Sequence, residues 1–259
     1  MNCINRKPPY PSYPKLHSLI FPILFEKACI TTRSFRKDAI KACGRVMPPI
    51  EVHGVENIPE KDTLSLITIN HYSRYGFDAW WIALAVSAAV PQDIHWIMTS
   101  SWTCQGKWYG FVVKRVTGIL FRMIAEVYDF TNMPPMPPSS AEFGERVIAM
   151  KKVISKIRNS QISTLAIAPE GRDFPGGILG PTPKGVGRFI QFISRLGFKV
   201  IPIGIYEDAG YLHVNIGENY SLPEIDSISS KDIDSIISNI VMNNIALLLP
   251  HPLRGEYVK

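Results

Sequence analysis

Short apolar runs alternate along the chain with stretches that place apolar residues three and four positions apart. Runs of the first kind, rich in β-branched residues, are typical of buried strands, and the second pattern is typical of amphipathic helices. The runs predict strands at residues 50–53, 64–69, 94–98, 164–168, 200–205 and 212–216. Because helical stretches separate several of these runs, we expect an α/β fold, with a mainly parallel sheet covered by helices on both faces.

Four stretches predict helices, at residues 79–90, 143–157, 184–196 and 229–241, and the last three show clear helical spacing. Ser139 and Glu142, three residues apart, form a capping-box pattern before the second stretch. Gly197 follows the third stretch, where a glycine commonly ends a helix. The first stretch, AWWIALAVSAAV, is apolar all round and predicts a buried or membrane-facing helix.

The N-terminal region has a different pattern. Residues 16–24 carry apolar side chains at helical spacing, and residues 27–45 carry six basic side chains against the single acid Asp38. This combination favours either a helix lying in a membrane interface or a helix packed on the domain with a solvated basic face. We therefore predict an amphipathic, membrane-associating helical segment over residues 1–45 and one domain over residues 46–259. No apolar run reaches the length of about 18 residues that a membrane-spanning helix needs.

Composition narrows the classes of function. The 259 residues include 28 basic and 22 acidic side chains, a net charge of +6 that favours an anionic partner such as lipid but is too small to indicate nucleic-acid binding. The four cysteines show no CxxC spacing, so neither a zinc site nor a disulfide framework is expected. The signatures GxSxG, HExxH and GxxxxGK[ST] are absent, which disfavours hydrolases of those types and P-loop proteins.

Two polar motifs directly follow predicted strands, where ligands bind in parallel α/β folds. Asn70 and His71 follow LSLITI, and PEGRD, residues 169–173, follows TLAIA. The guanidinium of Arg172 offers a planar fork of donors for a phosphate, and Glu170 is placed to hold that fork. Lys184, at the start of a predicted helix, adds positive charge to the same anion.

The segments NHYSRYGFD, APEGRDFPGG, PKGVGRFI and VIPIGI, in this order and spacing, resemble the glycerolipid acyltransferase family, the lysophosphatidic acid acyltransferase-like enzymes. The resemblance covers about residues 45–220. It implies a glycerol-3-phosphate acyltransferase-like fold for residues 46–259, which become the acyltransferase domain. It also implies transfer of a fatty acyl group from acyl-CoA or acyl carrier protein to the hydroxyl of a lysophospholipid or related acceptor. A second family motif matches either GILFR, ending at Arg122, or AEVYDF.

The resemblance implies that His71 is the general base and that Asp78 orients it as the second catalytic residue. Here the two are separated by six residues rather than four. On a continuous helix this step rises roughly 10 Å, too far for a hydrogen bond. Asp78 can therefore reach His71 only if the chain loops at Gly76 and the helix begins near Phe77. Asp173 and Glu170 are the alternative orienting carboxylates.

The residues expected to bind substrate are Asn70, Ser73, Glu170, Gly171, Arg172 and Lys184. Among them Arg172 is expected to hold the acceptor phosphate, with Lys184 as helper, and backbone donors around Gly171 are candidates for the oxyanion. No metal and no cofactor beyond the acyl-carrying co-substrate are expected. The expected partners are a membrane lipid surface, the acyl donor and the lysophospholipid, without nucleic acid, at the cytoplasmic side of a membrane. The alternative is a catalytically degenerate relative that binds lipid or acyl chains without turnover.

Two other groups of residues leave alternatives open. The histidines at positions 17, 53, 95, 213 and 251 are isolated in the sequence, and each is expected to be a surface or core residue without a chemical role. Five tryptophans, at positions 80, 81, 96, 102 and 108, gather after the first motif. They fit core packing, an aromatic-lined acyl groove or an interfacial belt.

Overall fold

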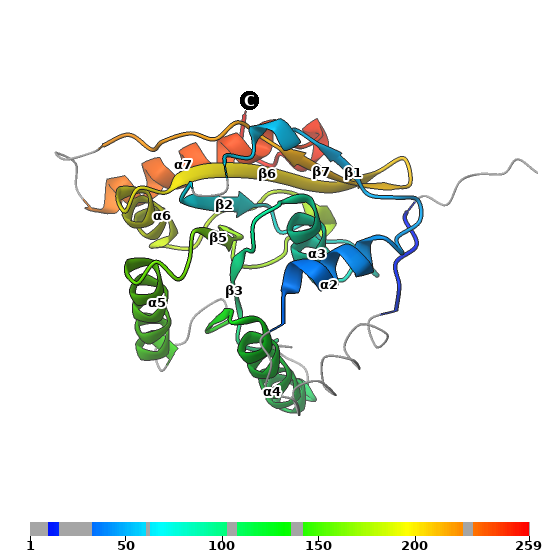
Figure 1. Ribbon diagram of the computed structural model, residues 1–259, viewed down its shortest axis with the longest axis horizontal. Helices are drawn as coiled ribbons and strands as arrows, with labels where there is room; N and C mark the ends of the chain where they lie inside the picture. Colours follow the sequence, from blue (N-terminus) through cyan, green and yellow to red (C-terminus); the bar gives the residue numbers. More distant parts are fainter. Residues whose placement is uncertain are drawn as a thin grey trace, which may run out of the picture.

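A twisted sheet crosses the centre of the molecule (Figure 1). The computed structural model describes residues 10–15, 33–60, 63–102, 108–135, 142–224 and 230–258. Within these residues the sheet has seven strands in the order β1-β7-β6-β2-β5-β3-β4. They are β1 (Glu51–His53), β2 (Ser65–Ile69), β3 (His95–Thr99), β4 (Thr131–Met133), β5 (Thr164–Ile167), β6 (Lys199–Asp208) and β7 (Tyr211–Ile216).

Most of the sheet is parallel. β2, β3, β4, β5 and β6 run in one direction, and β7 returns antiparallel to β6. β1 is parallel to β7, so this pair of strands runs against the rest. The expected α/β fold with a mainly parallel sheet is confirmed. The carboxyl ends of β2 and β5 meet at the same edge of the sheet, which is where ligands bind in such folds.

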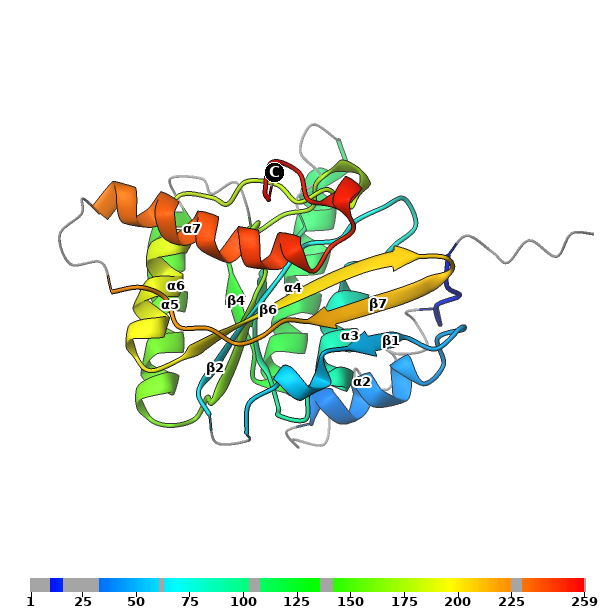
Figure 2. The same cartoon turned by 90° about the horizontal axis from the view of Figure 1, so that it is seen from above.

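Helices cover both faces of the sheet (Figures 1 and 2). The helices are α2 (Phe35–Cys43), α3 (Trp80–Ala89), α4 (Gly110–Tyr128), α5 (Phe143–Arg158), α6 (Val186–Arg195) and α7 (Ser230–Leu247), with short 3₁₀ turns at Val55–Asn57, Pro175–Gly177 and His251–Leu253. α3 and α4 pack in one hydrophobic cluster, and α5, α6 and α7 in another. Strand β2 contributes side chains to both clusters: Ile67 and Ile69 belong to the first, and Leu66 belongs to the second.

The predicted strands and helices agree closely with the structure, but two elements were not expected. β4 is only three residues long, TNM, and has no apolar run that would indicate a strand. α4 carries apolar residues on its exposed side as well as its buried side, so its sequence lacks a clean amphipathic period. Gly197 has a φ of +95° directly after α6 and its C-cap residue, as its position predicted. Glu142 occupies the N-cap of α5, but its side chain makes no capping hydrogen bond and instead accepts one from Lys114 Nζ; Ser139 lies outside the described residues.

The predicted helix over residues 16–24 also lies outside the described residues. The next part of the N-terminal region forms α2, which Ser34 caps by accepting a hydrogen bond from the Lys37 N–H. Ala39 and Ala42 of this helix are buried against Trp81 and Leu84 of α3. α2 is therefore part of the packed domain, and the predicted boundary at residue 45 does not coincide with an edge of the core.

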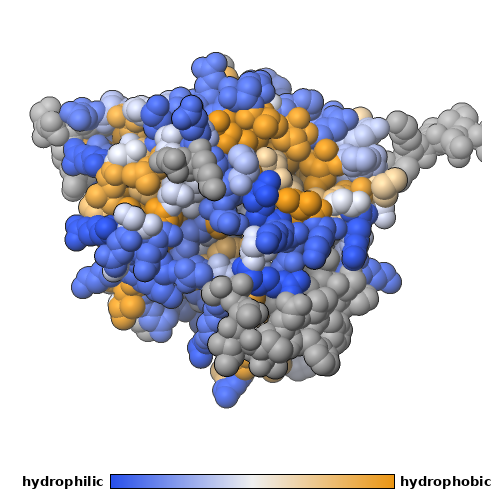
Figure 3. Space-filling model, viewed as in Figure 1, coloured by the Kyte–Doolittle hydropathy of each residue, from blue (hydrophilic) through white to orange (hydrophobic). Residues whose placement is uncertain are grey.

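One face of the molecule is mainly hydrophilic (Figure 3). The face in Figure 3 shows hydrophobic residues gathered in separate patches between larger hydrophilic areas. Among the described helices, none combines the length and the apolar character that crossing a membrane requires.

Candidate active site

The two polar motifs lie together at the carboxyl ends of β2 and β5, as the sequence predicted. The backbone N–H of His71 donates to Glu170 Oε2 at 2.5 Å. Ser73 Oγ donates to Asp173 Oδ2 at 3.3 Å. These hydrogen bonds join segments about a hundred residues apart in the sequence, so the two motifs form one site.

Asn70 fixes the point at which the first motif leaves the sheet. The residue is 1% exposed, and its side-chain amide makes two hydrogen bonds with the backbone of β6. Nδ2 donates to the Ile205 carbonyl at 2.8 Å, and Oδ1 accepts from the Ile205 N–H at 2.7 Å. Because both polar groups of the amide are occupied in this way, the side chain positions the motif.

Glu170 holds the two motifs together from inside. The residue is 1% exposed, and its second oxygen, Oε1, accepts a hydrogen bond from the Gly180 N–H at 2.8 Å. Burial raises the pKa of Glu170 to about 7, although the backbone donors of Gly180 and His71 oppose the rise. The sequence suggested that Glu170 would hold the Arg172 guanidinium, but its oxygens accept backbone N–H groups of other residues.

The ring of His71 lies in a partly buried position that favours the neutral form. Burial lowers the pKa of His71, and the negative charge of Asp173 opposes that effect. Nδ1 is buried and has no hydrogen-bond partner among the described residues. A neutral imidazole at the end of a strand is able to accept a proton from a bound hydroxyl.

The loop required for Asp78 is present. Gly76 has a φ of +79°, in the left-handed region that favours glycine, and α3 begins only at Trp80. The carboxylate of Asp78 is nevertheless exposed, and no hydrogen bond joins it to His71 within the described part of the chain. The acidic side chain whose charge acts on the His71 ring is Asp173, which raises the pKa of His71 against the effect of burial. The role of Asp78 stays a prediction.

Gly171 and Arg172 form the exposed part of the second motif. Gly171 has a φ of +64°, and its N–H donates to the Ala168 carbonyl at 3.0 Å. That N–H is therefore already used and is not available to an oxyanion. The Arg172 guanidinium carbon lies 4.7 Å from the centroid of the Phe174 ring, and the side chain makes no ion pair among the described residues.

Lys184 stands apart from these residues. It is exposed and does not line the cavity that contains His71 and Arg172. Backbone donors at the start of α6 bond to Asp234 of α7: the Gly185 N–H donates at 2.7 Å and the Arg188 N–H at 3.1 Å. The structure thus separates Lys184 from the site that it was predicted to assist.

A second buried glutamate supports the first motif and was not anticipated from the sequence. The side chain of Glu207, near the end of β6, is fully buried and forms an ion pair with the Arg74 guanidinium. It also accepts hydrogen bonds from Tyr13 Oη at 2.7 Å and Tyr72 Oη at 3.2 Å. Burial and the neighbouring carboxylate raise the pKa of Tyr13. Apart from an arginine close to the histidine, no local pattern indicates this cluster.

A cavity of about 520 Å³ opens beside His71. His71, Arg172 and Asp173 form one part of its wall, and Lys41 of α2 with Arg45, just after that helix, forms another. The remaining wall is mainly apolar and comes from α3, β3 and α4, with the residues Ile82, Trp96, Met98, Trp102, Phe121 and Ile124 among its members. The cavity therefore joins a polar end that contains the candidate base to an apolar interior.

Some of the tryptophans, and part of the possible second family motif, line this cavity, and others do not. Trp81 is 2% exposed and belongs to the core, whereas Trp80, like Trp96 and Trp102, lines the cavity. In the segment GILFR of α4, Phe121 lines the cavity and Arg122 is exposed outside its wall. The structure therefore gives Arg122 no contact with the candidate site.

Comparisons with known proteins point to one family. A family model described as Acyltransferase matches residues 49–206, which include both motifs. No curated protein matches the chain in sequence. The structure is similar to the crystal structure of the 1-acyl-sn-glycerophosphate (LPA) acyltransferase PlsC from Thermotoga maritima, with a TM-score of 0.54 and 16% sequence identity over 90% of this chain and 91% of that chain. At this identity the similarity shows a shared fold.

Proposed function

The chain belongs to the acyltransferase family, and we propose that it transfers a fatty acyl group from acyl-CoA or acyl carrier protein to the hydroxyl of a lysophospholipid or related glycerolipid. The observation that carries this proposal is the position of His71, partly buried where the polar end of the cavity meets its apolar interior, and burial there lowers its pKa. The solved relative acts on 1-acyl-sn-glycerophosphate, and a phosphate-bearing acceptor of that class suits the exposed guanidinium of Arg172.

In the proposed reaction His71 is a general base. Its ring accepts the proton of the acceptor hydroxyl as the oxygen attacks the thioester carbonyl, a contribution of roughly 10² to 10⁴ in rate. The carbon–sulfur bond then breaks and the thiol carrier leaves with a proton. Arg172 holds the acceptor phosphate, so that the hydroxyl stays close to His71. The acyl donor is a co-substrate, and the proposed chemistry needs no other cofactor.

The apolar part of the 520 Å³ cavity is the proposed binding site for the acyl chain. Its walls include Trp96, Phe121 and Ile124, which offer a surface that a hydrocarbon chain covers without leaving polar groups unpaired. Lys41 and Arg45, at the α2 wall, supply positive charge that suits the phosphates of an acyl carrier.

We further propose that α4 places the site at a lipid surface. Apolar side chains on its outer side are exposed to an unusual degree, with Phe111 73%, Val112 58%, Val116 59% and Ile119 57% exposed, and Trp108, just before the helix, is 93% exposed. They recur at helical spacing, and the basic residues Lys114 and Arg115 lie beside them. This pattern is typical of a helix that lies on an anionic membrane. Phe121 and Ile124 of the same helix line the cavity, so a lipid substrate would enter close to the surface.

The catalytic proposal is tested with labelled acyl-CoA and a panel of lysophospholipid acceptors that includes lysophosphatidic acid. We expect His71→Ala to reduce turnover by roughly 10² to 10⁴, because the proton acceptor is lost. His251→Ala, at an exposed histidine in a short turn far along the chain, is the matched control and is expected to leave turnover unchanged. Turnover that survives His71→Ala would overturn the proposed base. No turnover by the wild type with any acceptor or donor would favour a binding protein without catalysis.

The membrane proposal is tested by flotation with vesicles of neutral and anionic lipid. We expect Val112→Asp with Val116→Asp to weaken binding to anionic vesicles, because charges on the apolar stripe oppose insertion. Truncation at residue 45 would remove buried parts of α2, so Leu19→Ser with Ile23→Ser is the better test of the predicted N-terminal anchor. If the α4 variant binds as the wild type does and the N-terminal variant does not, the N-terminal segment is the anchor.

A further inference from the structure

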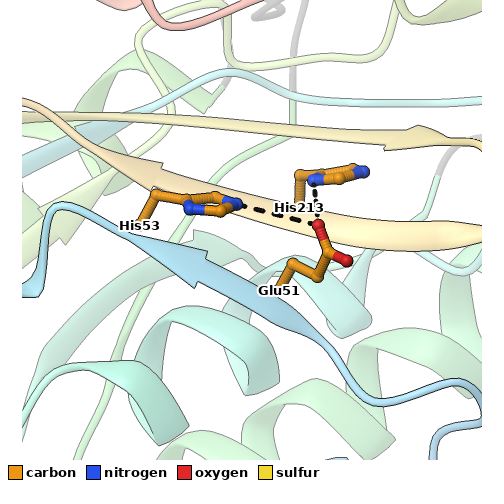
Figure 4. A group of neighbouring side chains, drawn as sticks. All are labelled: Glu51, His53 and His213. Carbon is orange, nitrogen blue, oxygen red and sulfur yellow. Dashed lines mark ion pairs between the residues drawn. The ribbon is translucent and has the colours of Figure 1, made fainter.

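A second group of chemically active side chains lies on β1, the strand at one edge of the sheet, and on its neighbour β7 (Figure 4). Glu51 and His53 lie on β1, and His213 lies on the neighbouring strand β7, where it is paired in register with Glu51. Residues two apart on a strand share a face of the sheet, so Glu51 and His53 point the same way. The two histidines, expected to be isolated, therefore meet: their rings are stacked with centroids 6.2 Å apart.

Both imidazole rings present a nitrogen to one carboxylate. Glu51 Oε2 lies 3.2 Å from His213 Nδ1 and 3.7 Å from His53 Nε2. Figure 4 shows both rings turned toward this oxygen. Nitrogen and oxygen atoms that converge in this way are the atoms that a metal ion takes as ligands.

The other nitrogen of His213 determines which tautomer the ring adopts. His213 Nε2 lies 3.3 Å from the backbone carbonyl of Asp208. A carbonyl can only accept a hydrogen bond, so Nε2 must carry a proton and donate. In the neutral ring Nδ1 is then unprotonated and faces a carboxylate oxygen, an arrangement that needs either a second proton or a cation between the two atoms. A metal-bound histidine commonly donates its remaining N–H to a backbone carbonyl in this way.

The ring is also held in place by packing. His213 stacks on Tyr206 with centroids 4.8 Å apart and an interplanar angle of 12°, and its side chain is 13% exposed. Glu51 and His53 are more open, with side chains 40% and 61% exposed. The group thus combines one fixed ligand with two that can adjust to an ion and remain reachable from solvent.

We propose that Glu51, His53 and His213 bind a divalent transition-metal ion, with Zn²⁺ as the leading candidate. The three ligand atoms lie within 4.8 Å of one another. Bonds of about 2.0–2.1 Å to a tetrahedral ion place neighbouring ligands roughly 3.3–3.4 Å apart, so small rotations of the exposed side chains suffice. Two imidazoles and one carboxylate suit Zn²⁺, Ni²⁺ or Cu²⁺ better than Mg²⁺ or Ca²⁺, which prefer oxygen ligands. Water completes the coordination.

The site is separate from the catalytic proposal. None of its residues lines the cavity beside His71. His53 instead lines a different hollow of about 550 Å³, shared with Tyr206 and Asn215 of the sheet and with residues after α7. An ion there would join the three-residue strand β1 to β7, which stabilises the edge of the sheet.

The test uses tag-free full-length protein, treated with a chelator and dialysed before titration with ZnCl₂ in a calorimeter. We expect one Zn²⁺ per chain at this site, and Co²⁺ to give a visible absorption band of tetrahedral type. Glu51→Gln and His53→Ala each remove one exposed ligand and are expected to weaken binding by roughly tenfold or more. His251→Ala, at an exposed histidine outside the cluster, is the matched control and is expected to bind as the wild type does.

The fold of each variant is checked separately by circular dichroism. Zn²⁺ should raise the unfolding temperature of the wild type and of His251→Ala, and the rise should be smaller or absent in Glu51→Gln and His53→Ala. Equal Zn²⁺ affinity in the wild type and in a Glu51→Gln, His53→Ala double variant would overturn the proposal and assign any binding to other residues. Absence of binding by the wild type would leave only an ion pair between a protonated histidine and Glu51, which also overturns it.

Discussion

Two buried glutamates hold the loop of the first motif, and they do so by different means. Glu170 accepts hydrogen bonds from two backbone N–H groups, those of His71 and Gly180. Glu207 accepts from the guanidinium of Arg74 and from two tyrosine hydroxyls. Both carboxylates are almost inaccessible to water, but only Glu207 has a cation beside it.

The difference shows how a buried carboxylate is stabilised. Neutral backbone donors satisfy the oxygens of Glu170 but do not balance its charge, so burial raises its pKa to about 7. The positive charge of Arg74 balances that of Glu207, and removal of either partner leaves one charge buried and unpaired. The raised pKa of Glu170 follows from its lack of a cation, whereas the burial of Glu207 depends on Arg74.

The largest effect is expected from Arg74→Met. This change leaves Glu207 without its cation, and we expect a loss of about 3–5 kcal/mol in the free energy of unfolding, measured by urea denaturation. Arg122→Met is the control, because Arg122 is exposed on α4, and it is expected to change stability by less than about 0.5 kcal/mol. Equal effects of the two substitutions would show that the Arg74–Glu207 pair contributes no more than an exposed arginine.

A smaller effect is expected from Glu170→Gln. The amide of glutamine keeps one acceptor but turns an N–H₂ group toward one of the two backbone donors. We expect a loss of about 1–3 kcal/mol near pH 8, together with reduced acyl transfer, because the His71 backbone loses its anchor. Gln161→Glu is the control: it makes the reverse exchange of amide and carboxylate at an exposed residue between α5 and β5, and it is expected to change stability little. Unchanged stability in Glu170→Gln would mean that the loop holds its position without this carboxylate.

The raised pKa of Glu170 predicts how the stability of the fold depends on pH. The folded chain holds the Glu170 proton more tightly than the unfolded chain, so this group stabilises the fold fully below its ordinary pKa of 4.5 and loses that contribution as the pH rises through about 7. Between about pH 5.5 and 8 we expect the wild type to lose about 2 kcal/mol relative to Glu170→Gln. The lowered pKa of His71 acts in the opposite direction, but His71 is present in both proteins and cancels in the difference. A constant difference across this range would contradict the assignment.

The smallest effect is expected from Tyr72→Phe. It removes one hydrogen bond to Glu207 but keeps the ring that packs against Gly177, so we expect a loss of about 0.5–1.5 kcal/mol. Tyr75→Phe is the control, since Tyr75 is fully exposed. A loss as large as that of Arg74→Met would show that the phenol, and not the guanidinium, is the main partner of Glu207.

The sequence predicted the parts of this molecule that depend on local pattern. β2 and β5 are apolar runs, so the pattern placed both motifs at the carboxyl ends of strands, and the family resemblance joined them in one site; that the two strands are neighbours comes from the structure. β4 was not predicted because three residues are too few to show an alternation of apolar and polar positions. α4 was not predicted because apolar residues lie on both its buried and its exposed side.

The polar clusters could not be predicted from the sequence, because they depend on the register between strands that are distant in the chain. Arg74 and Glu207 are 133 residues apart, and Glu51 meets His213 only because β7 reverses direction and pairs with β1. For the same reason the sequence did not predict the actual partners of Glu170, and it placed Lys184 at a site that this residue does not line. Glu170, two residues before Arg172, accepts hydrogen bonds from backbone N–H groups of other residues, and the backbone donors beside Lys184 bond to Asp234.

The amide of Asn70 makes position 70 intolerant of substitution. Ile205 presents one donor and one acceptor to it, so the side chain must offer the complementary pair at the same reach. Aspartate has the shape but lacks the donor, leucine has the shape but neither group, and glutamine has both groups one methylene too far out. In a saturation library we expect asparagine to be the most stable residue at this position. Any attempt to redesign the candidate active site has to treat Asn70 as part of the backbone.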